Sequence, residues 1–419
     1  MVTNQKPPRS SWLTTRRLRV HGLVLALCMW SVYAWDMSSP GLLDRNGLLK
    51  GTDFLHFYTI GTLAREHRGD LLYNMKAQAL MAPELVPDAE RIIYLPLYGP
   101  QVSLLFAPLA RLSYGSALMA WLGLTSLIYA GCCYALWQRC RWLQRERWTV
   151  AILAMGYPAF FHLIAWGQNS AIALLCFVAA FLALDEKKPW LAGLASGLLV
   201  YKPSLLLGPV LVLLLAMEWR ILVGAAVSSI AELGLGWAYY GGGVFNDYLQ
   251  QTLRVGKMMP LLEPRPYQMH SLRAFWTLLV PWPMMSSPLY GISVFLVVVV
   301  TARFWRSERT LGLRYAALLF ATVLVSPHLT VYDLTVLAPA FLLLADWLAE
   351  NWGDRRNWRL GTLLYFAFVL PLAGRLAAWT HLQLSVIAMA GVLGWLALES
   401  RSSINNQVAV ASVATAHPT

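Results

Sequence analysis

The sequence predicts an all-α membrane protein with many transmembrane helices. Of its 419 residues, 58% are hydrophobic and only 13% are charged, and the mean hydropathy is +0.52. Apolar runs recur along the whole chain, and each approaches the ~20 residues that a helix needs to cross a bilayer. The runs show no period-2 alternation, which excludes a transmembrane β-barrel and leaves helices as the way to satisfy the backbone in lipid.

The first expected span follows a basic segment. Residues 1–19 contain five Lys and Arg side chains, which predict a cytoplasmic tail, and the apolar run from Val20 to Trp35 comes next. No small-residue cleavage site follows this run, so we interpret it as a retained helix rather than a signal peptide. Residues 37–112 are then expected to form a first extracytoplasmic loop that contains interfacial helices.

Four basic loops set the expected path of the remaining chain, namely 139–148, 185–189, 303–309 and 354–359. All four lie in the cytoplasm if the short piece at 97–112, bounded by Pro100 and Pro108, is an interfacial helix and not a span. The later spans are then 115–137, 149–166, 170–184, 190–202, 203–217, 220–240, 288–302, 311–326, 330–348, 359–374 and 382–398.

This path gives about twelve spans within a single membrane domain, residues 1–400, and places both termini in the cytoplasm of a cell membrane protein. Residues 241–287 form a second extracytoplasmic loop, and 401–419 form a flexible tail. The stretch 190–217 leaves an alternative open, because reading it as one span would turn the later basic loops outward.

The expected path brings most of the polar candidates to the outer ends of the spans. Ionisable groups at membrane depth cost free energy, so each one that occurs there is a candidate functional residue. The net charge of +12 does not indicate a nucleic-acid partner, because most basic residues flank apolar runs. No set of His and carboxylate residues has a recognised metal-ligand spacing, and we expect neither a metal nor another cofactor.

Asp53 allows two interpretations. It lies in GTDFLHFYTIG, where Thr52 or Asp53 could cap a helix that starts at Phe54, or Asp53 could act as a base above the membrane. The residues do not decide between them. Phe54, Phe57 and Tyr58 recur at i, i+3 and i+4, which predicts an amphipathic helix on the membrane surface.

Lys202 and His328 also have two interpretations each. Lys202 precedes Pro203 at the end of an apolar run, and it either extends to the lipid headgroups or binds a phosphate inside the bundle. His328 precedes an expected helix start, where it either donates to a phosphate or bonds to Asp333.

Four further polar residues complete the candidates. Gln168 and Asn169 occupy a turn between two spans, where the amides contact a sugar or satisfy helix ends. Arg265 lies between two prolines in the 241–270 loop, which is either a lid over a phosphate or an ordinary basic loop. His270 lies in the same loop.

Several motifs occur in a fixed order: TDFLHFY, GDLLYN, YLPLYGPQVSLLFAPLA, GQNSAIALL, KKPWLAGLASGLLVYKP and SPHLTVYDLTVLAPA, within residues 50–345. With this set the chain resembles the GT-C superfamily of polyprenyl-phosphate-sugar-dependent glycosyltransferases. Within it, the chain resembles GT87 (DUF2029), the family related to α-mannosyltransferases. QMHSL at 268–272 departs from the NQSL of many relatives and leaves the role of His270 open, and the WWDYG signature of oligosaccharyltransferases is absent.

The resemblance implies a GT-C-type bundle and the transfer of one sugar, mannose, from a polyprenyl-phosphate donor to a lipid or glycan acceptor outside the cytoplasm. It implies that Asp53 is the general base. We expect the donor phosphate on Lys202, His328 and Arg265. The expected substrate contacts are His56, Tyr58, Gln168, Asn169, His270, Tyr332 and Asp333.

Two other classes of function remain as alternatives. A transporter or flippase of lipid-linked sugars would show repeated halves and ionisable residues near mid-membrane, and neither is evident. A non-catalytic membrane scaffold would leave the one-sided set of Asp, Lys, Arg and His without a purpose.

Overall fold

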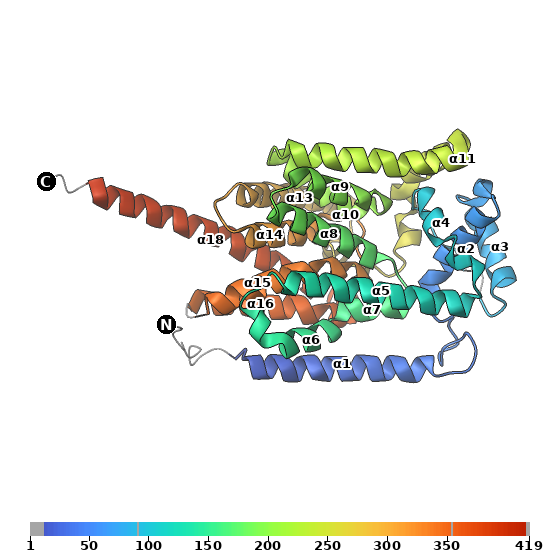
Figure 1. Ribbon diagram of the computed structural model, residues 1–419, viewed down its shortest axis with the longest axis horizontal. Helices are drawn as coiled ribbons and strands as arrows, with labels where there is room; N and C mark the ends of the chain where they lie inside the picture. Colours follow the sequence, from blue (N-terminus) through green and yellow to red (C-terminus); the bar gives the residue numbers. More distant parts are fainter. Residues whose placement is uncertain (1–11, 90–91, 353–354, 416–419) are drawn as a thin grey trace.

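The computed structural model describes residues 12–89, 92–352 and 355–415, and these form a helical bundle (Figure 1). The described residues contain no strand, only two isolated antiparallel bridges, Leu43–Leu49 and Met269–Thr330. Helices long and apolar enough to span a membrane recur along the chain. The prediction of an all-α polytopic membrane protein is therefore confirmed.

The first half of the described chain contains these elements: α1 (Thr15–Met37), α2 (Thr52–Arg65), η1 (Gly69–Leu71), α3 (Met75–Leu85), α4 (Gln101–Phe106), η2 (Leu109–Arg111), α5 (Tyr114–Trp137), η3 (Leu143–Glu146), α6 (Arg147–Met155), α7 (Pro158–Trp166), α8 (Ser170–Asp185), α9 (Pro189–Gly197) and η4 (Leu198–Tyr201). The second half contains α10 (Pro203–Leu215), α11 (Trp219–Leu262), η5 (Pro266–Gln268), α12 (Leu272–Leu279), α13 (Pro283–Trp305), α14 (Leu311–Val325), η6 (Val331–Leu337), α15 (Ala338–Glu350), α16 (Arg355–Val369), η7 (Leu370–Leu376), α17 (Ala377–Thr380) and α18 (Leu384–Thr415).

The candidate spans are of two kinds, long apolar helices and shorter ones. In the described chain, six helices are long and apolar enough to cross a membrane, and the pair Leu143–Met155 and Pro158–Trp166, bent by 45°, makes a seventh if it counts as one span. Five apolar helices are shorter, namely Ser170–Asp185, Pro189–Tyr201, Pro203–Leu215, Leu311–Val325 and Leu384–Glu399. Each of the twelve predicted ranges overlaps one of these helices or the bent pair, but the count of twelve stays a prediction.

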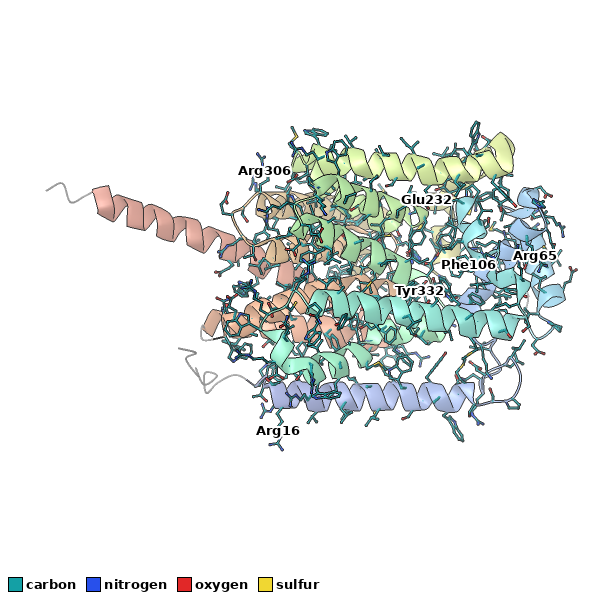
Figure 2. All side chains as sticks on the ribbon, viewed as in Figure 1. Arg16, Arg65, Phe106, Glu232, Arg306 and Tyr332 are labelled. Atoms are coloured by element: carbon teal, nitrogen blue, oxygen red, sulfur yellow. The ribbon has the colours of Figure 1, made fainter. Side chains whose placement is uncertain are left out.

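The bundle has two distinct ends (Figure 1). Helices α2, α3 and α4 gather at one end, while the start of α1 and the far part of α18 lie at the other. Arg16 and Arg306 lie at the end away from α2, whereas Arg65, the last residue of α2, lies at the opposite end (Figure 2). The basic clusters at 16–19 and 303–309 therefore share one end of the bundle, which the positive-inside argument requires of them.

Helix α14 forms the centre of the bundle. Its residues from Tyr315 to Val325 are all buried, and it packs against α10, α13, α15 and α18. A helix that is apolar on every side is stable only where other helices surround it. This central helix ends at Ser326, so the chain leaves it directly into the segment that carries His328 and Asp333.

Helix α2 is not the surface helix that the aromatic spacing predicted. Every residue from Phe54 to Ala64 is buried, and the helix lies among α3, α4, α5 and η2. The prediction of an amphipathic surface helix is therefore wrong. Leu55, Ile60 and Leu63 add apolar groups on the faces that the aromatics leave, so neighbours must cover the helix on all sides.

Two predicted loops contain more helix than expected. The 97–112 piece forms the six-residue α4 and the turn η2, and α4 is only about 9 Å long, far less than a hydrocarbon core. In the predicted 241–287 loop, α11 continues to Leu262 after a break at Gly241, where φ is 81°. Helix α18 likewise extends to Thr415, into the predicted tail, while residues 416–419 lie outside the described chain.

Glycines allow α9 and α11 to pack with their backbones in contact. A Cβ at Gly193 would lie 2.2 Å from the Ile221 carbonyl oxygen, and one at Gly197 would lie 2.1 Å from the Ala225 carbonyl oxygen. Neither carbonyl can move without bending α11. Because Gly197 immediately precedes η4, this contact also sets where the chain turns towards Lys202.

We expect Gly197→Ala to lower the free energy of unfolding by roughly 1–3 kcal/mol, because the new methyl group overpacks a backbone contact. Thermal unfolding of the detergent-purified protein measures this effect. Gly234→Ala is the matched control, since nothing lies within 4 Å of its Cβ position on α11. Equal stability of the two variants would contradict the close packing.

Candidate active site

Asp53 lies in the first turn of α2 but does not cap the helix. The N-cap is Gly51, with φ 65°, and it provides no side-chain hydrogen bond. The Thr52 hydroxyl donates to the Leu49 carbonyl oxygen at 2.7 Å, and Asp53 Oδ2 accepts from Gln168 Nε2 at 2.7 Å. The capping interpretation is therefore wrong for both residues, and Asp53 is oriented by a side chain from a distant turn.

The turn that supplies Gln168 is fitted closely to the start of α2. Helix α7 ends at Gly167 in the left-handed conformation, with φ 67°. A Cβ at Gly167 would lie 2.8 Å from Cβ of Phe54, and the Gly167 carbonyl oxygen accepts from Trp121 Nε1 at 3.0 Å. Glycine thus meets both the backbone angle and the close approach, and this contact holds Gln168 against Asp53.

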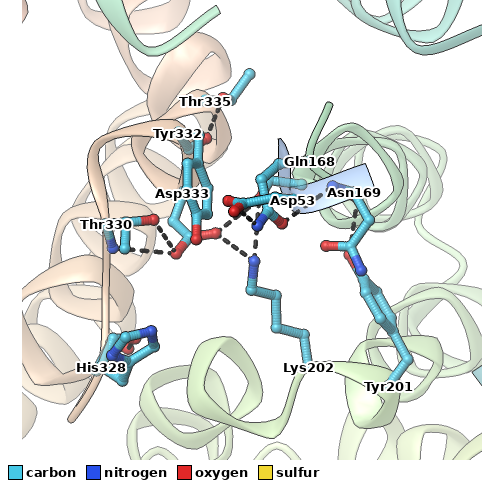
Figure 3. Close-up of polar contacts among 12 residues, drawn as sticks. Asp53, Gln168, Asn169, Tyr201, Lys202, His328, Thr330, Tyr332, Asp333 and Thr335 are labelled. Atoms are coloured by element: carbon cyan, nitrogen blue, oxygen red, sulfur yellow. Dashed lines mark hydrogen bonds and ion pairs between the residues drawn. The ribbon is translucent and has the colours of Figure 1, made fainter. Parts of the chain in front are cut away.

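A buried ion pair lies next to this carboxylate (Figure 3). Lys202 Nζ donates to Asp333 Oδ1 at 2.5 Å and to Ser170 Oγ at 3.0 Å, and Ser170 Oγ donates to the same Asp333 oxygen at 2.6 Å. Lys202 and Asp333 are 8% and 1% exposed. The pair therefore joins the α8 start, the break before α10 and the η6 start at one point.

The other carboxylate oxygen of Asp333 completes a capping box. Oδ2 accepts from the Thr330 backbone N–H at 3.1 Å and from its hydroxyl at 3.0 Å, and the Thr330 side chain caps η6 in return. The capping box thus satisfies the backbone N–H groups of Thr330 and Asp333 at the helix start beside His328.

Three polar aromatic or amide groups surround the ion pair. The Lys202 ammonium lies 5.3 Å from the ring centre of Tyr332, and the Tyr201 hydroxyl donates to the Asn169 carbonyl oxygen at 3.2 Å. The Asn169 amide is fully buried, and the Tyr98 hydroxyl lies close to it.

The electrostatic setting of Asp53 makes it a stronger base than an ordinary carboxylate. Burial raises the pKa of Asp53 from 3.8 to about 6, while the Gln168 hydrogen bond and the Lys202 charge oppose this rise and the Asp333 charge adds to it. A carboxylate with a pKa near 6 is ionised at neutral pH and accepts a proton more readily than an exposed one.

His328 belongs to a second buried cluster. Its Nδ1 lies 2.8 Å from Glu263 Oε1, and Glu263 also pairs with Arg273 through its other oxygen. Arg273 Nε donates to the Pro327 carbonyl oxygen at 2.5 Å. This cluster attaches the end of α11 and the start of α12 to the loop that carries His328.

The Glu263 contact sets the chemistry of the His328 ring. Burial lowers the pKa of His328 to about 4; the Asp333 charge opposes this fall, and the Lys202 and Arg273 charges add to it. In the neutral ring the proton lies on Nδ1, because a carboxylate accepts there, and Nε2 is then an acceptor. In this state His328 Nε2 accepts a hydrogen bond, whereas the predicted contact required it to donate one to a phosphate.

The structure places four predicted site residues apart from the ion pair. His56 is buried one turn after Asp53, and its ring centre lies 5.2 Å from that of Tyr94. The Tyr58 hydroxyl donates to the Leu112 carbonyl oxygen at 2.9 Å, and His270 Nδ1 lies 2.8 Å from Ser385 Oγ. Arg265 is exposed at the start of η5.

Sequence reasoning brought together Asp53, Gln168, Asn169, Lys202, Tyr332 and Asp333, and these do meet (Figure 3). It missed Ser170, Thr330, Tyr98, Glu263 and Arg273. Glu263 carried a usable signal, because it is the only acidic residue between Asp247 and Glu308 in a stretch with several cations. In the part of the chain that the structure describes, no three His, Cys, Asp or Glu side chains gather as a metal site would need.

The bundle and its buried acid–base groups define a membrane-embedded protein with an enzyme-like polar centre at one end. The sequence matches the model of glycosyltransferase family 87 over residues 97–327, more than half of the chain. The chain therefore belongs to glycosyltransferase family 87 and is a glycosyltransferase of the GT-C type. No curated protein and no solved structure matches it significantly.

We expect Lys202→Met alone to lower the free energy of unfolding by about 3–5 kcal/mol, because it leaves the Asp333 carboxylate buried without its partner. The double variant Lys202→Met with Asp333→Asn should recover most of this loss. Chemical unfolding of the four proteins of this double-mutant cycle, the Asp333→Asn single variant included, measures the coupling. Losses that simply add would show that the two groups do not act as a pair.

Proposed function

We propose that the chain transfers a single sugar from a polyprenyl-phosphate donor to a hydroxyl of a lipid or glycan acceptor, with Asp53 as the general base. The observation that carries this proposal is the partly buried Asp53 carboxylate beside the Lys202–Asp333 pair, in a chain of glycosyltransferase family 87. Mannose is the proposed sugar because the chain resembles the mannosyltransferases of this family.

The proposed reaction needs one base and no acid. The acceptor oxygen attacks the anomeric carbon while its proton passes to an Asp53 oxygen. The bond between the anomeric carbon and the phosphate oxygen breaks, and the polyprenyl phosphate leaves with the electron pair. Because that phosphate is already ionised near neutral pH, it leaves without protonation, in contrast to the alcohol released by a glycosidase.

Lys202 is the proposed contact for the leaving phosphate. An ammonium group has three N–H donors, and Asp333 and Ser170 accept two of them. The third can be donated to a phosphate oxygen without breaking the pair. Arg265 is exposed and outside the cluster, so we assign it no contact, and we assign none to His328, whose Nδ1 faces Glu263.

We further propose that the reaction takes place on the extracytoplasmic face of the cell membrane. Supporting this, Arg16 and Arg306 lie at the opposite end of the bundle from α2 (Figure 2), and Lys/Arg clusters mark the cytoplasmic side. A polyprenyl-phosphate sugar suits this face, because its energy-rich bond is carried by the lipid and needs no nucleotide sugar.

Replacing Asp53 by Asn should remove transfer and leave the fold intact. Asn keeps the size and can still accept from Gln168, but it cannot take up the acceptor proton. We expect kcat to fall by roughly 10²–10⁴ with a polyprenyl-phosphate mannose donor. Donor binding by calorimetry is the control and should not change. Near-normal transfer by Asp53→Asn would end the catalytic assignment.

The pH dependence follows from the raised pKa of Asp53. Transfer should increase as pH rises through about 6, where the carboxylate loses its proton, and kcat/KM should then level off. Between pH 3.8 and about 6 the folded protein holds a proton that the unfolded chain releases. The free energy of unfolding should therefore fall as pH rises through this window, and Asp53→Asn should abolish this loss. A flat wild-type profile in both measurements would contradict the shift.

Cysteine labelling in intact cells tests the face of action. In a cysteine-free background, Arg68→Cys near α2 should react with an impermeant thiol reagent, whereas Arg145→Cys should react only after permeabilisation. Both positions are exposed. The reverse pattern would place the Asp53 end of the bundle in the cytoplasm.

A further inference from the structure

A small cavity lies beside the face of α2 that carries Asp53. It is lined by His56 and Ile60 of α2, by Tyr98 and Gly99, and by Ser103 of α4, and it has room for about one water molecule. Asp53, His56 and Ile60 are spaced at i, i+3 and i+7 and so share one face of the helix. The cavity therefore lies along the same face of α2 as the base that the proposed function uses.

A buried polar atom without a hydrogen-bond partner lies in the wall of this cavity. His56 is 5% exposed and its Nδ1 makes no hydrogen bond, and Asn169, which is fully buried, lies outside the cavity lining. Tyr98 connects the two, because its ring centre lies 5.9 Å from that of His56 and its hydroxyl is near Asn169. Buried polar atoms are paired in most proteins, so unpaired ones at a cavity indicate a ligand or ordered water.

Hydrogen bonds fix the walls of the cavity. The Tyr73 hydroxyl donates to the Tyr98 carbonyl oxygen at 2.9 Å, and Ser103 Oγ lies 2.6 Å from the Tyr240 hydroxyl of α11. The Tyr94 hydroxyl donates to the Thr52 carbonyl oxygen at 2.5 Å, directly before Asp53. These hydrogen bonds hold Tyr98 and Ser103 of the cavity wall in place, and the space between them suits a group about the size of a hydroxyl.

We propose that this cavity binds one hydroxyl group of a pyranose ring and thereby selects the sugar that reacts at Asp53. The proposal rests on the proposed function and adds the selecting residues, His56 and Tyr98, and the chemical group that they recognise. The hydroxyl belongs either to the donor sugar or to the acceptor sugar, since both must lie beside Asp53 in the reaction.

A series of deoxy sugars tests the proposal with the purified full chain. The probes are polyprenyl-phosphate mannose as donor, octyl α-mannopyranoside as acceptor, and the monodeoxy analogues of each. One analogue should react roughly ten- to hundredfold more slowly in kcat/KM than its parent, because it leaves His56 Nδ1 unpaired. Whether that analogue is a donor or an acceptor identifies the source of the hydroxyl.

His56→Phe is the informative variant, because it keeps the ring that packs against Tyr94 and Tyr98 and removes both ring nitrogens. It should slow the parent sugar to nearly the rate of that one analogue, with little change for the analogue itself and no loss of thermal stability. His67→Asn, at the exposed histidine that follows α2, is the matched control and should retain the full discrimination. If His56→Phe does not fold, Ser103→Ala provides the second test on the same analogue.

Binding separates this proposal from the proposed function. The Asp53→Asn protein should bind the parent sugar and reject the same analogue in calorimetry, whether or not Asp53 is the base. Equal binding and equal rates for every analogue would mean that the cavity holds only water, and the proposal would be overturned. A His56→Phe protein that slows all probes alike would overturn it as well.

Discussion

The candidate site depends on one ion pair, that between Lys202 and Asp333. It connects three places where helices begin: the start of α8 through Ser170, the start of α10 after Lys202, and the capped start of η6. A buried pair of this kind adds little net stability, because desolvation offsets most of the attraction. Its effect is positional, since any shift of one helix end would leave a charge buried without its partner. The three ends are thereby held in register around Asp53.

The charged groups around the site form separate clusters in which positive and negative charges cancel. Asp333 neutralises Lys202, Arg273 neutralises Glu263, and His328 is held neutral by burial. Asp53 alone lacks a cationic partner in direct contact, because only the Gln168 amide hydrogen-bonds it. The effect of burial then outweighs the opposing effects of the Gln168 hydrogen bond and the Lys202 charge, which is why the pKa of Asp53 rises where that of a salt-bridged carboxylate would fall.

The sequence was sufficient for the class of fold and for most of the cluster, because polar residues at the ends of neighbouring apolar runs must lie near the same membrane surface. It could not supply the pairing of Lys202 with Asp333, which are far apart in the chain and meet only through tertiary packing. The burial of α2 was different, since its apolar residues cover every face and already indicated a helix inside the bundle. The spacing of Phe54, Phe57 and Tyr58 predicted one apolar face, but the opposite face of α2 is not polar enough for a surface helix.

The site is assembled from residues inside and outside the segment that matches the family. Residues 97–327 include Gln168, Ser170 and Lys202 but neither Asp53 nor Asp333. Gln168, Ser170 and Lys202 donate to the two carboxylates from within the matched segment, and Thr330, outside it, also donates to Asp333. A carboxylate that is removed from water is stable only where other donors replace the water. The position of each carboxylate therefore depends on donors from a distant part of the chain.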